Sequence, residues 1–237
     1  IFGRSCGLYC CVIFEFKCEL TQNIIRICHI FGSREVIDNL HLDASSFEPW
    51  AAVFTGSFNR KRMHEKNHGR VRPKKSLGQH FLKDQNIARK IVDALRPTEK
   101  DVVLEVGPGM GVLTRYLLER EGIRLKLSEI DRDAVAYLKD HYPMLKDSIL
   151  EGDFLELNLS AQFPGEKISV IGNFPYNISS QIFFRVLDHR DQVVQVVGML
   201  QKEVADRIAA PHGSKVYGIL SVLLQAFYKV EYLFRVA

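Results

Sequence analysis

The chain has 237 residues, of which 46% are hydrophobic and 25% are charged, and its net charge is +4. This is an ordinary globular composition, and the length suffices for one well-buried core. The positive charge suits a polyanionic partner without requiring one. The longest apolar run near the start, Leu8 to Phe14, is far too short to cross a bilayer and lacks the cleavage site of a secretory signal. We therefore expect a cytoplasmic protein with no membrane partner.

The five cysteines all lie near the start of the chain, at Cys6, Cys10, Cys11, Cys18 and Cys28. Their spacing matches no zinc pattern, and no histidine pair completes one, so we expect no metal. The rest of the chain contains no cysteine, which excludes a disulfide framework there and is consistent with a reducing compartment.

Residues 1–62 show no sustained helical or alternating pattern, and they contain the only tryptophan, Trp50. We expect this segment to be non-native or disordered rather than a domain. Met63 stands at the head of a strongly patterned sequence, so one hypothesis makes Met63 the natural start and the preceding residues upstream sequence. The alternative is a genuine N-terminal extension.

Residues 63–83 form a basic arm. Between Arg60 and Lys75 there are eight basic residues and one acid, Glu65. A solvated, partly disordered arm is one interpretation. Contact with phosphate groups is the other, because the arm has several charges and no aromatic residue before Phe81.

From Asp84 the sequence alternates regularly between helix and strand patterns. Asp84 can cap a helix with Ile87, Ile91 and Leu95 on one face, ended by Pro97. We expect strands at Val102–Val106, Leu125–Glu129, Ser148–Glu151, Ile168–Gly172, Val193–Leu200 and Lys229–Val236, and helices at 111–121, 133–141, 178–189, 201–210 and 217–226. This alternation predicts an α/β fold with a doubly wound, mostly parallel sheet over residues 84–237.

Four of the predicted strands are followed by a glycine or a polar residue: Gly107, Glu129, Asp153 and Asn173. Ligands of such sheets bind beyond the carboxyl ends of the strands, so these residues should meet in one crevice. The loop Gly107-Pro108-Gly109-Met110-Gly111 lets a ligand approach the backbone, although it is neither a P-loop nor the dinucleotide fingerprint.

Glu129 stands where an acid would accept hydrogen bonds from ribose hydroxyls, about 20 residues after the glycine loop. The alternative is an ordinary surface acid. Asp153 is a candidate acceptor for the adenine amine of a cofactor, and the alternative is a turn aspartate.

The motif Asn173-Phe174-Pro175-Tyr176 indicates methylation of a conjugated amine. Such a transfer is a direct displacement that needs neither a metal nor a covalent nucleophile, but it needs an amine held in place. The asparagine oxygen and a carbonyl preceding or belonging to the proline can accept both amine protons, while the tyrosine ring stacks on the base. The alternative is a tight proline turn at a strand end.

Five ordered motifs together resemble the small-subunit ribosomal RNA adenine dimethyltransferases, over roughly residues 70–237. The motifs are Lys74–Leu82, the loop Glu105–Gly109, Gly152-Asp153, Gly172–Ser180 and Met199–Ala205, and the stretch Gly213–Gly218 extends the match. The resemblance implies a class I, Rossmann-like fold that uses S-adenosyl-L-methionine. It also implies transfer of two methyl groups to each of two neighbouring adenosines near the 3′ end of small-subunit rRNA, within a maturing small subunit, by a monomeric enzyme.

The same resemblance assigns roles to individual residues. Catalytic roles fall on Asn173, Pro175 and Tyr176. Cofactor contacts fall on His80, Leu82, Gly107, Gly109, Glu129, Asp153 and Asn173. We expect RNA contacts from Arg70, Arg72, Lys74, Lys75, Lys202 and Lys215.

The chain departs from the family pattern in three places. The family usually has Asn where His80 stands and Leu where Phe174 stands. In the family, a proline-rich segment, another strand and a small helical domain follow the point where Val236-Ala237 stops. We therefore expect the last sheet strand and the RNA-facing helical domain to be missing, which puts autonomous activity in question.

Two other functions fit parts of the pattern. The large-subunit rRNA adenine methyltransferases of antibiotic resistance share the loop and the Asn-x-Pro-aromatic motif, but the context Gly172–Ser180 and the run Leu200–Ala205 favour the small-subunit group. A non-catalytic RNA-binding assembly factor could keep the same fold, although intact Glu129, Asp153 and Asn173 favour catalysis.

Overall fold

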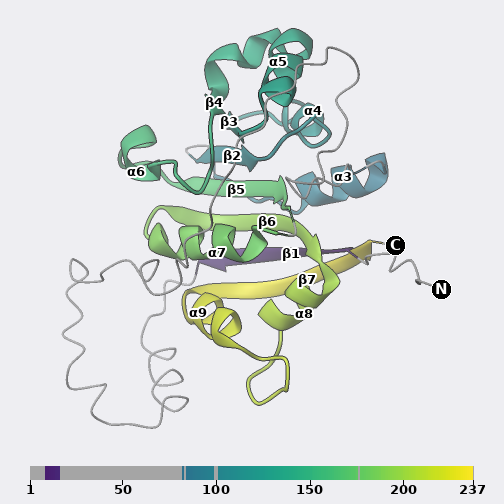
Figure 1. Cartoon of the computed structure of the whole chain (residues 1–237), viewed down its shortest axis with the longest axis vertical. Helices are drawn as coiled ribbons and strands as arrows, with labels where there is room; N and C mark the ends of the chain where they lie inside the picture. Colours follow the sequence, from purple (N-terminus) through teal and green to yellow (C-terminus); the bar gives the residue numbers. More distant parts are fainter. Residues whose placement is uncertain (1–8, 17–81, 83, 99–100, 176, 237) are drawn as a thin grey trace, which may run out of the picture.

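The computed structural model describes residues 9–16, 82, 84–98, 101–175 and 177–236. Within these residues seven strands form one sheet in the order β4-β3-β2-β5-β6-β1-β7 (Figure 1). The strands are β1 (Tyr9–Phe16), β2 (Val102–Val106), β3 (Arg124–Glu129), β4 (Ile149–Glu151), β5 (Ile168–Asn173), β6 (Val193–Gln201) and β7 (Tyr228–Val236). Strands β2 to β6 pair in parallel, whereas β1 pairs antiparallel with both β6 and β7. The predicted doubly wound α/β sheet is confirmed.

Helices cover both faces of the sheet and enclose two hydrophobic cores (Figure 1). One core lies under α6 (Leu159–Gln162), α7 (Ser179–Asp188), α8 (Lys202–Ile208) and α9 (Ile219–Phe227). The other lies under α3 (Gln85–Asp93), α4 (Thr114–Leu117), α5 (Arg132–His141) and the 3₁₀ helix η3 (Pro143–Ser148). None of the helices in these described ranges is long and apolar enough to cross a membrane.

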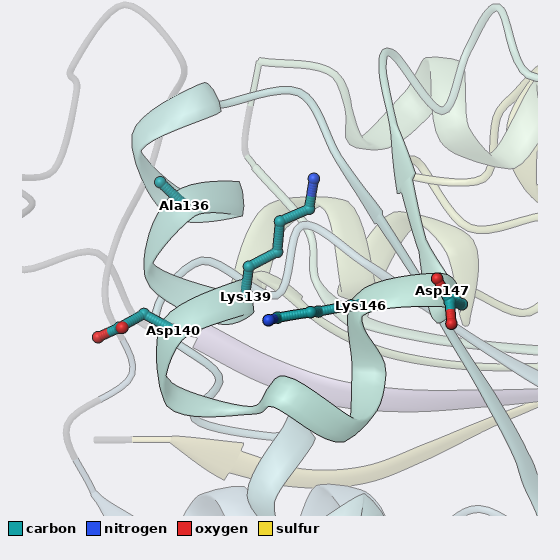
Figure 2. Close-up of a pocket in the computed structure, with 5 residues that line it drawn as sticks. All are labelled: Ala136, Lys139, Asp140, Lys146 and Asp147. Atoms are coloured by element: carbon teal, nitrogen blue, oxygen red, sulfur yellow. The ribbon is translucent and has the colours of Figure 1, made fainter.

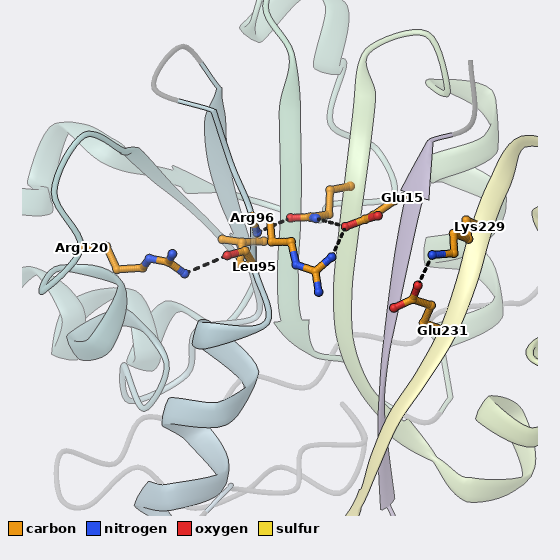
Figure 3. Close-up of polar contacts among 7 residues, drawn as sticks. Glu15, Leu95, Arg96, Arg120, Lys229 and Glu231 are labelled. Carbon is orange, nitrogen blue, oxygen red and sulfur yellow. Dashed lines mark hydrogen bonds and ion pairs between the residues drawn. The ribbon is translucent and has the colours of Figure 1, made fainter. Parts of the chain in front are cut away.

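Helix α3 follows its sequence signals closely. Asp84 accepts hydrogen bonds from the backbone N–H groups of Asn86 (2.8 Å) and Ile87 (3.3 Å), which caps the helix. Ile91 and Leu95 are fully buried. At the other end, the Arg120 guanidinium donates to the carbonyls of Val92 and Leu95, the second of which is drawn in Figure 3. The Val92 carbonyl also accepts the N–H of Leu95 at 3.1 Å, so Arg120 adds a side-chain donor to the carbonyls at the end of the helix.

The structure differs from the sequence prediction after β2. The helix expected over 111–121 is only the single turn α4, flanked by turns. Gly111 has φ 76° and Gly122 has φ 75°, both in the left-handed region that a right-handed helix cannot contain. The short helices η3 and α6 had no prediction, because neither is long enough to show a helical period.

Strand β1 lies within residues 1–62, for which the sequence showed no sustained pattern. Tyr9–Phe16 lies between β6 and β7 and pairs along its length with both. Cys10 and Val12 are buried in the core under α7, while Cys11 and Ile13 are buried in the opposite core. A strand buried on both faces is a continuous apolar run, and so it shows no alternation. The seventh strand of the sheet is thus supplied by β1, and the other residues of 1–62, including Trp50, lie outside the described part of the chain.

A polar cluster fastens the end of β1 to the rest of the fold (Figure 3). Glu15 accepts hydrogen bonds from the Arg96 guanidinium (3.2 Å) and from the Gln195 amide (3.3 Å). Gln195 in turn accepts from the backbone N–H of Arg96 (2.8 Å). The cluster therefore joins β1, β6 and the segment that follows α3.

Candidate active site at the carboxyl ends of the strands

The carboxyl ends of β2, β3, β4 and β5 meet at one edge of the sheet, as the sequence predicts. Glu129 stands opposite Glu151 in the β3–β4 register. The N–H of Gly107 donates to Ser128 O, and that of Gly152 donates to Glu129 O, both at 2.9 Å. The chain order reverses its direction across the sheet between β2 and β5, which is where open α/β sheets form their ligand crevice.

The glycine loop after β2 needs its glycines for two different reasons. Gly107, Gly109 and Gly111 have φ of 67°, 56° and 76°, which strains any residue with a side chain. A Cβ on Gly107 would meet nothing within 4 Å, so this position is open to a ligand. A Cβ on Gly111 would meet the Tyr142 ring at 2.6 Å, so this glycine makes room for packing.

Glu129 ties the glycine loop to the end of β3. Its side chain is 3% exposed, and its two carboxylate oxygens accept the N–H groups of Gly109 and Asp131, each at 2.9 Å. Burial raises the pKa of Glu129, and these backbone hydrogen bonds oppose the rise. Each carboxylate oxygen can accept a second hydrogen bond, so the bonds to the loop leave acceptor capacity for ribose hydroxyls.

Glu105 is a site residue that sequence reasoning missed. It lies in β2 just before the glycine loop, is 1% exposed, and accepts a hydrogen bond from the Thr114 hydroxyl at 2.7 Å. This bond joins β2 to α4 across the loop and so fixes both ends of it. The signal was present in the sequence: Glu105 is a single acid inside the otherwise apolar strand Val102–Val106.

Asp153 shapes the turn after β4. Its side chain accepts the N–H of Leu155 (3.0 Å), and its carbonyl accepts the N–H of Glu156 (3.0 Å). The turn aspartate considered from the sequence is therefore present. A contact with a cofactor amine stays a prediction.

The motif after β5 is arranged as a tight turn at a strand end. Asn173 stands opposite Met199 in the β5–β6 register, and both Asn173 and Pro175 are partly exposed. The carbonyl of Pro175 accepts the N–H of Ile178 at 3.2 Å. One of the two carbonyls considered for holding an amine is therefore engaged inside the turn. Tyr176 lies outside the described residues.

The remaining predicted site residues divide into three groups. Leu82 is 9% exposed and belongs to the core under α3, so its side chain packs against the protein. Lys202 follows β6 directly and pairs with Asp206, while Lys215 is exposed in the loop between α8 and α9. His80, Arg70, Arg72, Lys74 and Lys75 lie outside the described residues.

A separate surface hollow contains none of these residues. Figure 2 shows this hollow of about 580 Å³ beside α5 and η3. It is lined by Ala136, Lys139, Asp140, Lys146 and Asp147. Two lysines and two aspartates line it, so their charges cancel, and Lys139 also pairs with Glu151. Within the described residues no group of three or more His, Cys, Asp or Glu side chains could hold a metal ion.

The sheet and its strand-end residues define a class I methyltransferase fold. The chain belongs to the ribosomal RNA adenine dimethylase family, whose sequence model matches residues 70–237. It is 60% identical over 167 residues to the Ribosomal RNA small subunit methyltransferase A of Parabacteroides distasonis, covering 70% of this chain and 62% of that protein. The protein of the same name from Cytophaga hutchinsonii is 56% identical over 169 residues, covering 70% of this chain and 65% of that protein.

A solved structure shows the same fold. It is a dimethyladenosine transferase from Plasmodium falciparum, with a TM-score of 0.52 and 31% identity, covering 62% of this chain and 52% of that chain. The present chain spans a little over three fifths of the length of the curated relatives above, at 62% and 65%.

Proposed function

We propose that this chain is the catalytic part of an enzyme that uses S-adenosyl-L-methionine to dimethylate the N6 amine of adenosine in small-subunit rRNA. The observation that carries the proposal is the position of Asn173 at the end of β5, next to the end of β2 from which the glycine loop starts. A group that can hold an amine and a loop that can admit a methyl donor thus share one edge of the sheet. The family membership and the names of the relatives support the same reaction.

The strand-end residues fit the cofactor. Gly107 admits its close approach, and Glu129 has acceptor capacity for two ribose hydroxyls. Ile130, which is 44% exposed directly after Glu129, offers apolar surface to a flat purine ring. Asp153 follows the next strand and would accept the adenine amine. When bound, the cofactor supplies an electrophilic methyl group on a sulfonium centre.

The chain's own residues hold the target amine. The Asn173 side-chain oxygen accepts one amine proton and turns the nitrogen lone pair toward the methyl group. Because the Pro175 carbonyl already accepts the N–H of Ile178, we assign the second proton to the carbonyl of Phe174. Both oxygens stabilise the positive charge that develops on the nitrogen. Tyr176 stacks on the base.

The finer features of the function belong to the same proposal. The substrates are two adjacent adenosines near the 3′ end of the rRNA, in a maturing small subunit, and the enzyme acts as a cytoplasmic monomer. Cys10 and Cys11 are free, buried thiols, which is consistent with a reducing compartment. The basic residues of the arm and of the α8–α9 loop would contact the RNA backbone.

Asn173→Ala tests the reaction. The change should lower methyl transfer to under-methylated small subunits by about 10²–10³-fold, or about 2.7–4 kcal/mol of barrier, because one preorganised acceptor is removed. Transfer from labelled cofactor measures the rate, and calorimetry should find an almost unchanged cofactor affinity. The chain is assayed as printed and also extended by the C-terminal region of its relatives.

Glu129→Ala is the matched control, because it should show the opposite pattern. Loss of this acceptor should weaken cofactor binding by about 1–3 kcal/mol. Near-normal methylation by Asn173→Ala would refute the proposed mechanism. Transfer to large subunits instead would favour the antibiotic-resistance type, and RNA binding without transfer would favour an assembly factor.

A further inference from the structure

Phe174, the second residue of the motif, lies inside the core rather than at the site edge. Its side chain is 2% exposed, between the partly exposed Asn173 and Pro175. It belongs to the core under α7. Its ring therefore cannot take part in stacking on a base, and its role has to be found in what surrounds it.

The ring occupies a notch made by two glycines. Gly172 of β5 and Gly198 of β6 are direct partners in the parallel register. A Cβ on Gly172 would lie within 3.0 Å of Phe174 Cε1, and a Cβ on Gly198 would lie within 3.0 Å of Phe174 Cε2. One edge of the ring thus rests on each strand. Real Cβ atoms do not approach so closely, so Gly198 is needed to admit the ring, while Gly172 admits both the ring and the carbonyl oxygen of Val106, which its Cβ would meet at 2.6 Å.

Two further contacts hold the same residue. The N–H of Phe174 donates to the carbonyl of Met199 at 3.2 Å. Phe183 of α7 packs edge-on against the ring, with centroids 5.9 Å apart and planes at 87°. The residue is therefore fixed by β5, β6 and α7 together.

We propose that Phe174, seated on Gly172 and Gly198, is the positioning residue that fixes Asn173 and Pro175 for methyl transfer. This inference rests on the function proposed above and adds a residue to it. Asn173 and the Phe174 carbonyl are at most one peptide unit from the seated ring, so the seat sets where both acceptors stand. A displacement of about 1 Å at such a site can cost about 10²-fold in rate.

Gly198→Ala tests the packing of the Phe174 ring on Gly172 and Gly198, because its new methyl group must push the ring aside. We expect kcat to fall about tenfold or more, while KM for the RNA and the cofactor affinity change by less than about twofold. Adding Phe174→Leu to the same chain removes the ring atoms that clash, and it should restore most of kcat. Gly218→Ala is the matched control: its φ is −138° and its Cβ would meet nothing within 4 Å, so it should keep the kcat of the unmodified chain, although this N-cap position of α9 favours glycine over alanine.

Amide hydrogen exchange reports on the position of the motif and does not depend on enzyme activity. The N–H of Phe174 should exchange faster in Gly198→Ala and return to its original rate in the Gly198→Ala/Phe174→Leu double variant, while a thermal melt confirms that both are folded. Absence of methyl transfer by the chain extended with the C-terminal region of its relatives would refute the proposed function, and the exchange rates would still show whether the ring positions the motif. Unchanged exchange and kcat in Gly198→Ala would overturn the inference. A loss of kcat in Gly198→Ala that Phe174→Leu fails to restore would also overturn it, because the damage would then lie in β6 and not at the Phe174 ring.

Discussion

Glu105 carries its carboxyl group in the middle of an otherwise apolar strand, where it is 1% exposed. Burial raises its pKa from 4.5 to about 8, against the opposing effect of the Thr114 hydrogen bond. At neutral pH the folded chain therefore keeps this carboxyl protonated, while the unfolded chain ionises it. Glu129, close by, raises the pKa of Glu105 further.

This proton makes the stability of the fold depend on pH. Between pH 4.5 and about 8 the folded state binds one proton more than the unfolded state at Glu105, so the free energy of unfolding should fall as pH rises. The slope from this group is at most about 1.4 kcal/mol per pH unit. Glu105→Gln should remove the slope and keep the acceptor for Thr114, and so should be more stable than the unmodified chain near pH 8.

Urea unfolding at several pH values measures this effect. Glu119→Gln is a suitable control, because the Glu119 side chain is 63% exposed and should leave the slope unchanged. Equal slopes for Glu105→Gln and the unmodified chain would show that Glu105 is ionised in the folded state.

Elements with a clear start signal, a clear end signal and a hydrophobic period could be predicted from the sequence. β2 has the predicted bounds, and the predicted cap and buried face of α3 are confirmed. The strand ends could be placed because parallel strands deliver their carboxyl ends to one edge. Sequence reasoning failed where three-dimensional context decides. The side chains that surround Phe174 come from β6 and α7, and the burial of Glu105 depends on helices on both sides.

β1 was missed for a related reason, since its partners are the most distant elements of the chain. Its apolar run matched no period, and nothing local identifies a strand whose two neighbours are β6 and β7.

Val12→Asp tests whether β1 is an integral strand. The change places a carboxylate in the core under α7, where Val12 is fully buried, and should cost about 3–5 kcal/mol of unfolding free energy. Val216→Asp is the control, because Val216 is 54% exposed and the same change there should cost little. Should Val12→Asp fail to fold, Ile13→Val gives a milder measure, with an expected loss of about 0.5–1.5 kcal/mol. Equal urea midpoints for all variants would show that β1 is not part of the cooperatively folded unit.

RNA binding should depend on the positive charge of the basic arm and not on the net charge of the whole molecule. Neutralising Arg70, Arg72, Lys74 and Lys75 should weaken RNA binding and lower the slope of log affinity against log salt by about 0.7–0.9 for each phosphate group that the arm no longer neutralises. A filter-binding titration at several salt concentrations measures the slope. Neutralising Lys126, Lys139, Lys146 and Lys167 changes the net charge by the same amount. Of these, Lys126 and Lys167 donate to the backbone carbonyls of Asp147 and Asp191, and Lys139 forms an ion pair with Glu151. A slope that falls equally in both variants would assign the effect to net charge and not to the arm.

The position of β1 also constrains the order in which the strands of the sheet can pair. Tyr9 pairs with Gln201 and Val236, so β1, the first of the described strands to leave the ribosome, waits for β6 and β7, the last of them to be made. At about 5–20 residues per second, that wait is on the order of 10–40 s. During this time its apolar run has neither neighbour, and an unpaired apolar strand is prone to aggregation. Pairing of β1 with β6 and β7 then inserts an earlier segment between two later ones, a pairing of high contact order that is intrinsically slow.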